Sequence, residues 1–155
     1  MSQPPAEFDA YFALLEVGSL VQHGVEQQLR DTGGLSFVQF QILAVLAESA
    51  DGTQTMTTVA DRLVHSRSGL TYQAQKLEAA GLLTRSPAPG DDRTTVLALS
   101  VQGRELLARV LPGHIDVVRD VLLDPLDAGD RAELTRILDK VRLHMRRRPP
   151  RSAKR

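Results

Sequence analysis

The sequence predicts a mainly α-helical fold with a small β-hairpin wing, arranged as a winged helix–turn–helix between N- and C-terminal helices. Three observations lead to this prediction. Residues 57–81 have the pattern of two short helices joined by a tight turn, and residues 82–99 that of a two-stranded hairpin with a Pro- and Gly-rich tip. The segments on either side repeat apolar residues at helical spacing. In a winged helix–turn–helix the second helix enters a DNA major groove.

Two helices are predicted ahead of this motif. Residues 6–30 carry an apolar residue on nearly every turn, and the glycine pair that follows is typical of a helix exit. Ser36 is expected to begin the next helix, at residues 37–48, with Gln39 completing a capping box. This second helix is apolar on most of its surface, which predicts a central place in the core. A turn signal follows at residues 51–53.

Within the motif, Thr57 or Thr58 is expected to cap the first helix, which runs to about Val64. Ser66 can cap the second helix after a short turn. Gly81 stands where a helix commonly ends in a left-handed residue. These signals place the second helix between Ser66 and Gly81.

The second helix divides into an inner and an outer face. At 100° per residue, Leu70, Ala74 and Leu77 form one apolar stripe. Nearly all the outward side chains can form hydrogen bonds: Ser68, Thr71, Tyr72, Gln75 and Lys76, with Ala79 the exception. Gln can bond adenine, Thr can contact a thymine methyl, and Lys can meet phosphate.

At the start of the same helix, Ser66, Arg67 and the free amides of the first turn suit a phosphate. The alternative is an ordinary amphipathic helix with a solvated polar face. The preceding helix and the following hairpin favour DNA reading.

The wing is expected to have strands at residues 82–85 and 94–99, with no regular structure in the Pro- and Gly-rich segment between them. Arg93 can enter a narrow minor groove, where the negative potential is concentrated. Asp91 is expected to orient this guanidinium through a bidentate pair. The alternative is a solvated loop with an idle surface ion pair.

The C-terminal part is predicted to be helical. Ser100 is the expected N-cap of a long helix, which Pro112 should kink or split because proline removes a backbone donor. A last helix is expected at residues 128–146. The tail, residues 147–155, is too polar and Pro-rich to pack and is predicted to be disordered.

Composition and charge limit the class of protein. The 155 residues suffice for one domain, and the absence of cysteine excludes disulfides, thiolate metal sites and thiol redox sensing. Without a membrane-spanning stretch, we expect a cytoplasmic, nucleoid-associated protein with no membrane partner. Residues 142–155 contain seven basic and no acidic residues, leaving 12 basic and 19 acidic residues elsewhere. Residues 66–85 are mildly basic, which fits local attraction to phosphates on an acidic body.

These residues resemble the MarR (multiple-antibiotic-resistance regulator) family of bacterial transcription factors. The resemblance covers about residues 8–146. It is most specific in the segment VADRL…SRSGLTYQAQKLEAAGLLTR, the Asp91-x-Arg93 wing motif and the L-S-x-x-G step at residues 99–103. It implies a homodimer with interleaved terminal helices (residues 6–34 and 101–146) around winged domains (residues 36–100). It also implies palindromic operator DNA, usually bound by a repressor that a small phenolic or anionic ligand releases.

The resemblance assigns the DNA contacts to the helix from Ser66 to Lys76 and to Arg93. Asp91, Arg93 and Thr94 form the predicted DNA-binding wing, in which Thr94 departs from the family pattern because the family often has a second Arg there. The missing cysteines exclude the peroxide-sensing subclass. An effector cleft between the dimer helices and the winged domain can be lined by Phe12, His23 and Phe40, although these residues also suit core and surface positions.

Other classes of function find little support. The four histidines lie on separate predicted elements without a metal-binding spacing, and no phosphate loop or nucleophile motif occurs. We therefore expect no cofactor and no enzymatic activity. The alternative to a DNA-binding regulator is a winged-helix module that binds a protein partner and little specific DNA.

Overall fold

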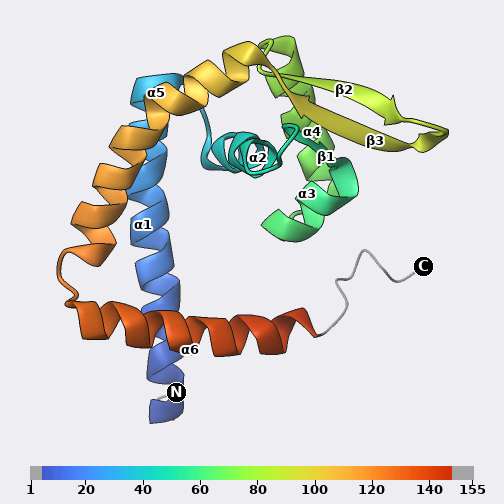
Figure 1. Cartoon of the computed structure of the whole chain (residues 1–155). Coiled ribbons are helices and arrows are strands. Elements are labelled where there is room, and N and C mark those ends of the chain that lie inside the picture. Colours follow the sequence, from blue (N-terminus) through green and yellow to red (C-terminus); the bar gives the residue numbers. More distant parts are fainter. Residues whose placement is uncertain (1–4, 148–155) are drawn as a thin grey trace.

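The computed structural model describes residues 5–147, which form six α-helices and a three-stranded sheet (Figure 1). A 3-10 turn, Ala6–Phe8, precedes α1, and a π-helical turn, Arg119–Leu123, follows α5. The elements are α1 (Asp9–Gly33), α2 (Phe37–Ala47), β1 (Thr53–Thr55), α3 (Met56–Leu63), α4 (Arg67–Ala79), β2 (Leu83–Ala88), β3 (Asp91–Leu99), α5 (Val101–Val118) and α6 (Ala128–Arg146). The predicted fold class is confirmed. All but the first residue of the predicted tail lies outside the described residues.

The helices form two groups (Figure 1). α1 and α5 lie side by side, while α2, α3, α4 and the sheet form the winged domain beside their upper ends. α6 leaves the end of α5 and runs across towards α3. None of the described helices is long and apolar enough to cross a bilayer.

α2 lies at the centre of the hydrophobic core, as its composition predicts. Ile42, Leu43 and Leu46 of this helix are fully buried. They pack in one cluster with Val25 and Leu29 of α1 and with side chains from α3, α4, the sheet and α5. The winged domain is therefore fixed to the last turns of α1 and the first turns of α5.

The sheet is larger than the sequence predicts. Its order is β1-β3-β2, with antiparallel pairing throughout, and β1 was not predicted because three residues carry no visible alternation. The two wing strands also extend further towards the tip, since Pro87 lies within β2 opposite Thr95. Proline is tolerated there because β2 is an edge strand. Gly90, with a φ of 76°, helps to make the tight turn at the tip.

Most predicted helix boundaries are confirmed. The Ser36 hydroxyl accepts a hydrogen bond from the Gln39 amide (3.2 Å), and the Gln39 side chain accepts one from the Ser36 amide (3.0 Å), so the capping box is present. Ser66 and Ser100 cap their helices as predicted. The predicted cap at Thr57 or Thr58 is wrong. Thr55 is the N-cap of α3, because it ends β1 in an extended conformation and its hydroxyl accepts from the Thr58 amide.

Pro112 does not split the fifth helix. α5 continues through it and bends along its course (Figure 1). Pro112 has no amide hydrogen, so the Ala108 carbonyl loses its hydrogen-bond donor within the helix. Both residues are exposed, so water can solvate this carbonyl. The regular helix ends later, at the π-helical turn Arg119–Leu123.

A large apolar surface remains uncovered outside the winged domain. It consists of the N-terminal half of α1, the middle of α5 and one side of α6. Its main side chains are Tyr11, Phe12, Leu14, Leu15, Val17, Leu20, Leu111, Ile115, Ile137, Leu138, Val141 and Met145. We call this set the arm surface.

Candidate nucleic-acid interface

α3 and α4 are joined by a tight turn that sets the direction of α4. The turn begins at Val64, which has a φ of 56° and is the one non-glycine residue with positive φ in residues 5–147. Ser66 then caps α4 by accepting a hydrogen bond from the Gly69 amide at 3.2 Å. Ser66 and Arg67 are exposed at the positive end of the helix, where an anion would be stabilised.

The inner face of α4 is as predicted. Leu70, Ala74 and Leu77 are buried, with at most 1% of each residue exposed. These three residues attach α4 to the core along one stripe and leave the opposite face turned outward. The helix can therefore enter a groove without loss of its own packing.

The outer face of α4 carries the predicted hydrogen-bonding side chains. Ser68, Tyr72, Gln75 and Lys76 are exposed, while Thr71 is half-buried and its hydroxyl donates to the Arg67 carbonyl at 2.7 Å. The Lys76 ammonium lies 4.7 Å from the centre of the Tyr72 ring, a cation–π distance. Gln75 has no side-chain hydrogen bond among the described residues, so its amide is free to bond a base edge.

Arg85 does not add to the positive charge of this face. Its guanidinium pairs with Glu78 at 2.7 Å, and its backbone amide donates to the same carboxylate at 3.1 Å. The hydrogen bond from the Arg85 side chain is the main cause that holds the pKa of Glu78 below its usual value. The net positive charge of α4 therefore comes from Arg67 and Lys76.

The wing is organised differently from the prediction. The Asp91 carboxylate accepts hydrogen bonds from the Thr94 hydroxyl (2.7 Å) and the Arg93 backbone amide (3.0 Å), and these bonds lower the pKa of Asp91. The predicted Asp91–guanidinium pair is wrong, because the backbone and Thr94 already occupy this carboxylate. Among residues 5–147 the Arg93 side chain, which is exposed, forms no ion pair. The wing thus presents Arg93 as a free cation on a fixed turn.

Thr94 has a role that sequence reasoning missed. The sequence predicts Thr94 as a wing contact with DNA in place of a second arginine, and in the structure its hydroxyl also completes the Asp91 turn. Aspartate side chains in turns often bond the backbone two residues further on, so Asp91 beside the Pro- and Gly-rich tip could have indicated this turn.

The three residues predicted to line an effector cleft do not meet within one chain. Phe40 is buried against His114, with 4.4 Å between the ring centres. Phe12 is exposed near the start of α1 and packs on Tyr11. His23 is exposed near the middle of α1.

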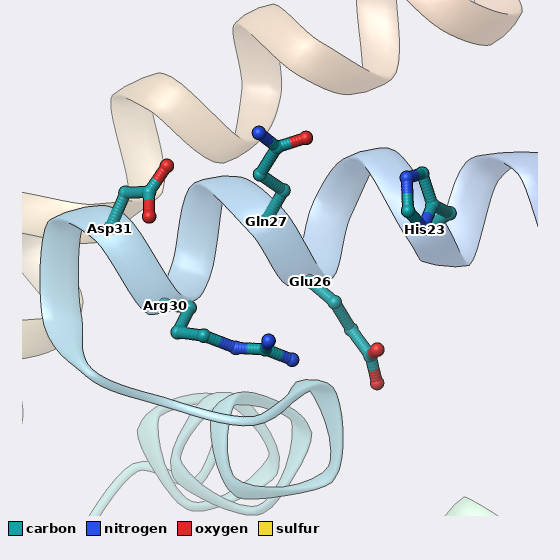
Figure 2. Close-up of a pocket in the computed structure, with 5 residues that line it drawn as sticks. All are labelled: His23, Glu26, Gln27, Arg30 and Asp31. Carbon is teal, nitrogen blue, oxygen red and sulfur yellow. The ribbon is translucent and has the colours of Figure 1, made fainter.

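His23 borders a shallow polar hollow of about 390 Å³ on the side of α1 (Figure 2). Glu26 and Arg30 point towards α2, whereas Gln27 and Asp31 point to the side of α5. All five lining residues come from one helix, and acidic and basic side chains alternate on it. None of the residues that line this hollow is aliphatic, Phe or Tyr, so it lacks the apolar side chains that usually surround an aromatic ligand.

Sequence reasoning also missed a polar pair between α1 and α5. The Gln28 side chain donates to the Val110 carbonyl at 3.2 Å, and its carbonyl oxygen is buried without a protein partner. The Nδ1 atom of His114, beside Phe40, is likewise buried without a protein partner. Burial lowers the pKa of His114, which favours the neutral ring.

Comparisons with known proteins extend the similarity over nearly the whole chain. The sequence profile described as "MarR family" matches residues 33–94, from the end of α1 to the wing. The HTH-type transcriptional regulator PecS of Dickeya dadantii is 32% identical over 112 residues, which are 72% of this chain and 67% of PecS.

Two solved structures from Streptomyces coelicolor have the same fold. AbsC, a MarR family transcriptional regulator, is 30% identical with a TM-score of 0.86, and the match covers 96% of this chain and 99% of AbsC. Sco3205, a MarR family regulator solved in complex with DNA, is 29% identical with a TM-score of 0.84 over 91% of this chain and 88% of Sco3205.

Proposed function

We propose that this chain, which belongs to the MarR family of transcriptional regulators, is a dimeric repressor that binds palindromic operator DNA and is released by a small aromatic or anionic effector. The observation that carries the DNA-binding part is the two-sided character of α4. Leu70, Ala74 and Leu77 bury one face, while the opposite face offers free hydrogen-bonding side chains. The DNA complex of Sco3205 supports this use of the fold.

The proposed contacts divide into reading and anchoring. Gln75, with Ser68, Thr71 and Tyr72 beside it, would read base edges in the major groove. Ser66, Arg67 and Lys76 would hold phosphates at the two ends of this face. Arg93 would enter the adjacent minor groove, with Asp91 and Thr94 holding its backbone in place.

Gln75→Ala and Arg93→Ala are expected to act differently on DNA affinity. Loss of Gln75 should remove about 1–3 kcal/mol of discrimination at one base pair, because a bidentate base contact disappears. Loss of Arg93 should weaken binding to all duplexes and reduce the salt slope by about one per protomer, because a phosphate-rich groove loses its cation. The measurement is affinity at several salt concentrations for a duplex selected from a random library and its single-base variants.

Arg109→Ala is the matched control for Arg93→Ala, since Arg109 is exposed on α5 outside the winged domain. It should leave the salt slope nearly unchanged. If both the Gln75 and Arg93 variants lose affinity with the same base preference, Gln75 is not a reader. If the wild-type chain binds every duplex as weakly as random DNA, the protein-interaction module is the better function.

The arm surface supports a homodimer as the binding form. It gathers twelve large apolar side chains from three helices, each at least 40% exposed, and exposed apolar patches of this kind mark interaction sites. A second copy is the partner that a palindromic site requires, since two-fold symmetry of the operator matches two-fold symmetry of the protein. α1, α5 and α6 of two chains would bury one another.

The effector is proposed to bind where the winged domain joins α1 and α5. The Phe40 ring packs on the His114 ring there, and Gln28 and His114 have buried polar atoms without protein partners. Aromatic rings beside a few polar groups are typical of small-molecule sites. Phe12 and His23 would belong to this site only if the second chain brings them closer.

Small aromatic acids are expected to release the selected duplex. Binding would favour a domain spacing that no longer matches successive major grooves, so apparent DNA affinity falls as ligand is added. Fluorescence anisotropy of the labelled duplex, titrated with a panel of benzoate-type acids, measures this release. Equal duplex affinity at millimolar concentrations of every acid in the panel would contradict an effector of this class.

A further inference from the structure

The C-terminal end of α6 is bonded directly to the helix–turn–helix. The Arg146 guanidinium donates one hydrogen bond to the Asp61 carbonyl at 2.6 Å and a second to the Arg62 carbonyl at 3.2 Å. Both acceptors are backbone atoms in the last turn of α3. This contact joins the last residue of the final helix to the helix that immediately precedes the α4 turn.

The carbonyl groups in the last turn of α3 lack hydrogen-bond donors within their own helix. The last four carbonyls of an α-helix have no partner within the helix. In α3 the amides of Val64 and His65 both donate to the Ala60 carbonyl, which leaves the next carbonyls open. A guanidinium at the negative end of a helix satisfies these acceptors and is favoured by the helix dipole. The Arg146 side chain thus caps the C-terminal end of α3 from a distant part of the chain.

The rest of the boundary between α6 and α3 is open. A cavity of about 730 Å³ lies there, lined by Leu14 of α1, Val64 of the turn, and Leu138, Val141 and Met145 of α6 among others. Within one chain, the two Arg146 hydrogen bonds therefore join α6 to α3 across a hollow whose apolar lining belongs to the arm surface. On its other side, α3 is held by an ion pair between Arg62 and Glu48 at the end of α2.

We propose that Arg146 is a positioning residue that fixes the angle between the winged domain and the α6 arm, and so selects the spacing of the two DNA half-sites. The proposal rests on the proposed function, in which α6 belongs to the dimer arm. α4 follows α3 after a three-residue turn, so a fixed α3 fixes the direction of α4. In a dimer this direction sets the separation and relative rotation of the two reading helices.

The dependence of DNA affinity on the spacing between half-sites reports on how firmly this angle is held. Adding one base pair between half-sites moves them apart by about 3.4 Å and rotates one against the other by about 35°. A dimer with rigidly held winged domains tolerates this change poorly. A dimer whose winged domains pivot on the α1 and α5 junction alone tolerates it better.

The test uses the full chain and a duplex that the wild-type protein selects from a random library. The half-sites are then moved by one base pair closer, and by one and two base pairs apart. The wild-type chain is expected to lose about tenfold or more in affinity at each altered spacing. Arg146→Ala should reduce this loss to about threefold or less, with a smaller change in affinity for the selected duplex.

Arg142→Ala is the matched control. Arg142 lies one turn earlier on α6 and borders the same cavity, but it pairs with Asp139 of its own helix at 2.8 Å. It removes the same charge and should keep the wild-type spacing profile. Arg146→Lys should lie between wild type and Arg146→Ala, because one ammonium can bond one of the two carbonyls but not both in a fixed fork.

Two results would overturn the proposal. One is an unchanged spacing profile in Arg146→Ala, and the other is equal broadening in Arg142→Ala, which would assign the effect to charge alone. If Arg146→Ala fails to fold, the comparison of the spacing profile of Arg146→Lys with that of the wild-type chain tests the proposal instead. A library that yields no duplex for the wild-type chain contradicts the proposed DNA-binding function itself, which is a different outcome from a duplex with an unchanged profile.

Discussion

Gly103→Ala is expected to lower the free energy of unfolding by about 4 kcal/mol or more, or to prevent folding. A Cβ atom at Gly103 would lie 2.0 Å from the Leu82 carbonyl oxygen and 2.9 Å from Leu99 Cδ1, distances far inside van der Waals contact. The Leu82 carbonyl cannot easily move away, because it accepts the Ser100 amide at 3.2 Å. The Ser100 hydroxyl in turn donates to the Gly81 carbonyl at 2.7 Å and accepts the Gly103 amide.

Urea-induced unfolding measured by circular dichroism tests this expectation. Gly24→Ala is the control, since Gly24 is also helical and its added Cβ would meet Val117 and Val121 at 3.5 and 3.7 Å, ordinary contact distances. This change should be neutral or stabilise by up to about 1 kcal/mol. Similar unfolding midpoints for the two alanine variants would show that the first turn of α5 can shift away from β2.

Leu15→Glu is expected to dissociate the proposed dimer and to weaken binding to a palindromic duplex by about 100-fold or more. Leu15 lies in the arm surface on α1, where 51% of the residue is exposed in one chain. A carboxylate that a second copy buries without a partner costs several kcal/mol. Each monomer then binds one half-site, and the gain in affinity from the linked second half-site is lost. Light scattering gives the mass, and anisotropy gives the duplex affinity.

Gln102→Glu is the control for this substitution. Gln102 is exposed in the first turn of α5, next to the winged domain, and the change adds the same charge at a position where the helix dipole favours it. It should leave both the mass and the affinity unchanged. A Leu15→Glu chain that remains dimeric at micromolar concentration would place the second copy on another surface.

Local chemistry in the sequence predicted most of the fold. Ser36, Ser66 and Ser100 each begin a helix because a hydroxyl cap needs only the next three residues, and all three are confirmed. The Leu70, Ala74 and Leu77 stripe was predicted for the same reason, since helical periodicity is local. The exposed positions of Gln75 and Arg93 follow from these elements. Their contacts with DNA remain predictions.

The features that the sequence did not predict depend on distant partners. β1 exists because Thr53 pairs with Ala98, and the cap of α3 at Thr55 follows from that strand. Arg146 belongs to a basic C-terminal segment in the sequence, and its contact depends on the carbonyls of Asp61 and Arg62, which lie more than 80 residues away along the chain. The Asp91 carboxylate can accept hydrogen bonds either from the Arg93 guanidinium or from nearby backbone and hydroxyl groups. The geometry of the turn determines that it accepts from the Arg93 amide and the Thr94 hydroxyl.

The sheet order has a consequence for folding kinetics. β2 and β3 are neighbours in the chain and can pair through a tight turn, whereas β1 must wait for β3 before it has any partner. Pairing β1 with β3 closes the long loop between them, which costs chain entropy. Only three residue pairs between β1 and β3 offset this cost directly. β1 is thus expected to join the sheet late and to leave it first. Because α3 starts at the residue after β1, local unfolding at this strand would loosen the helix–turn–helix from its N-terminal side while the wing stays formed.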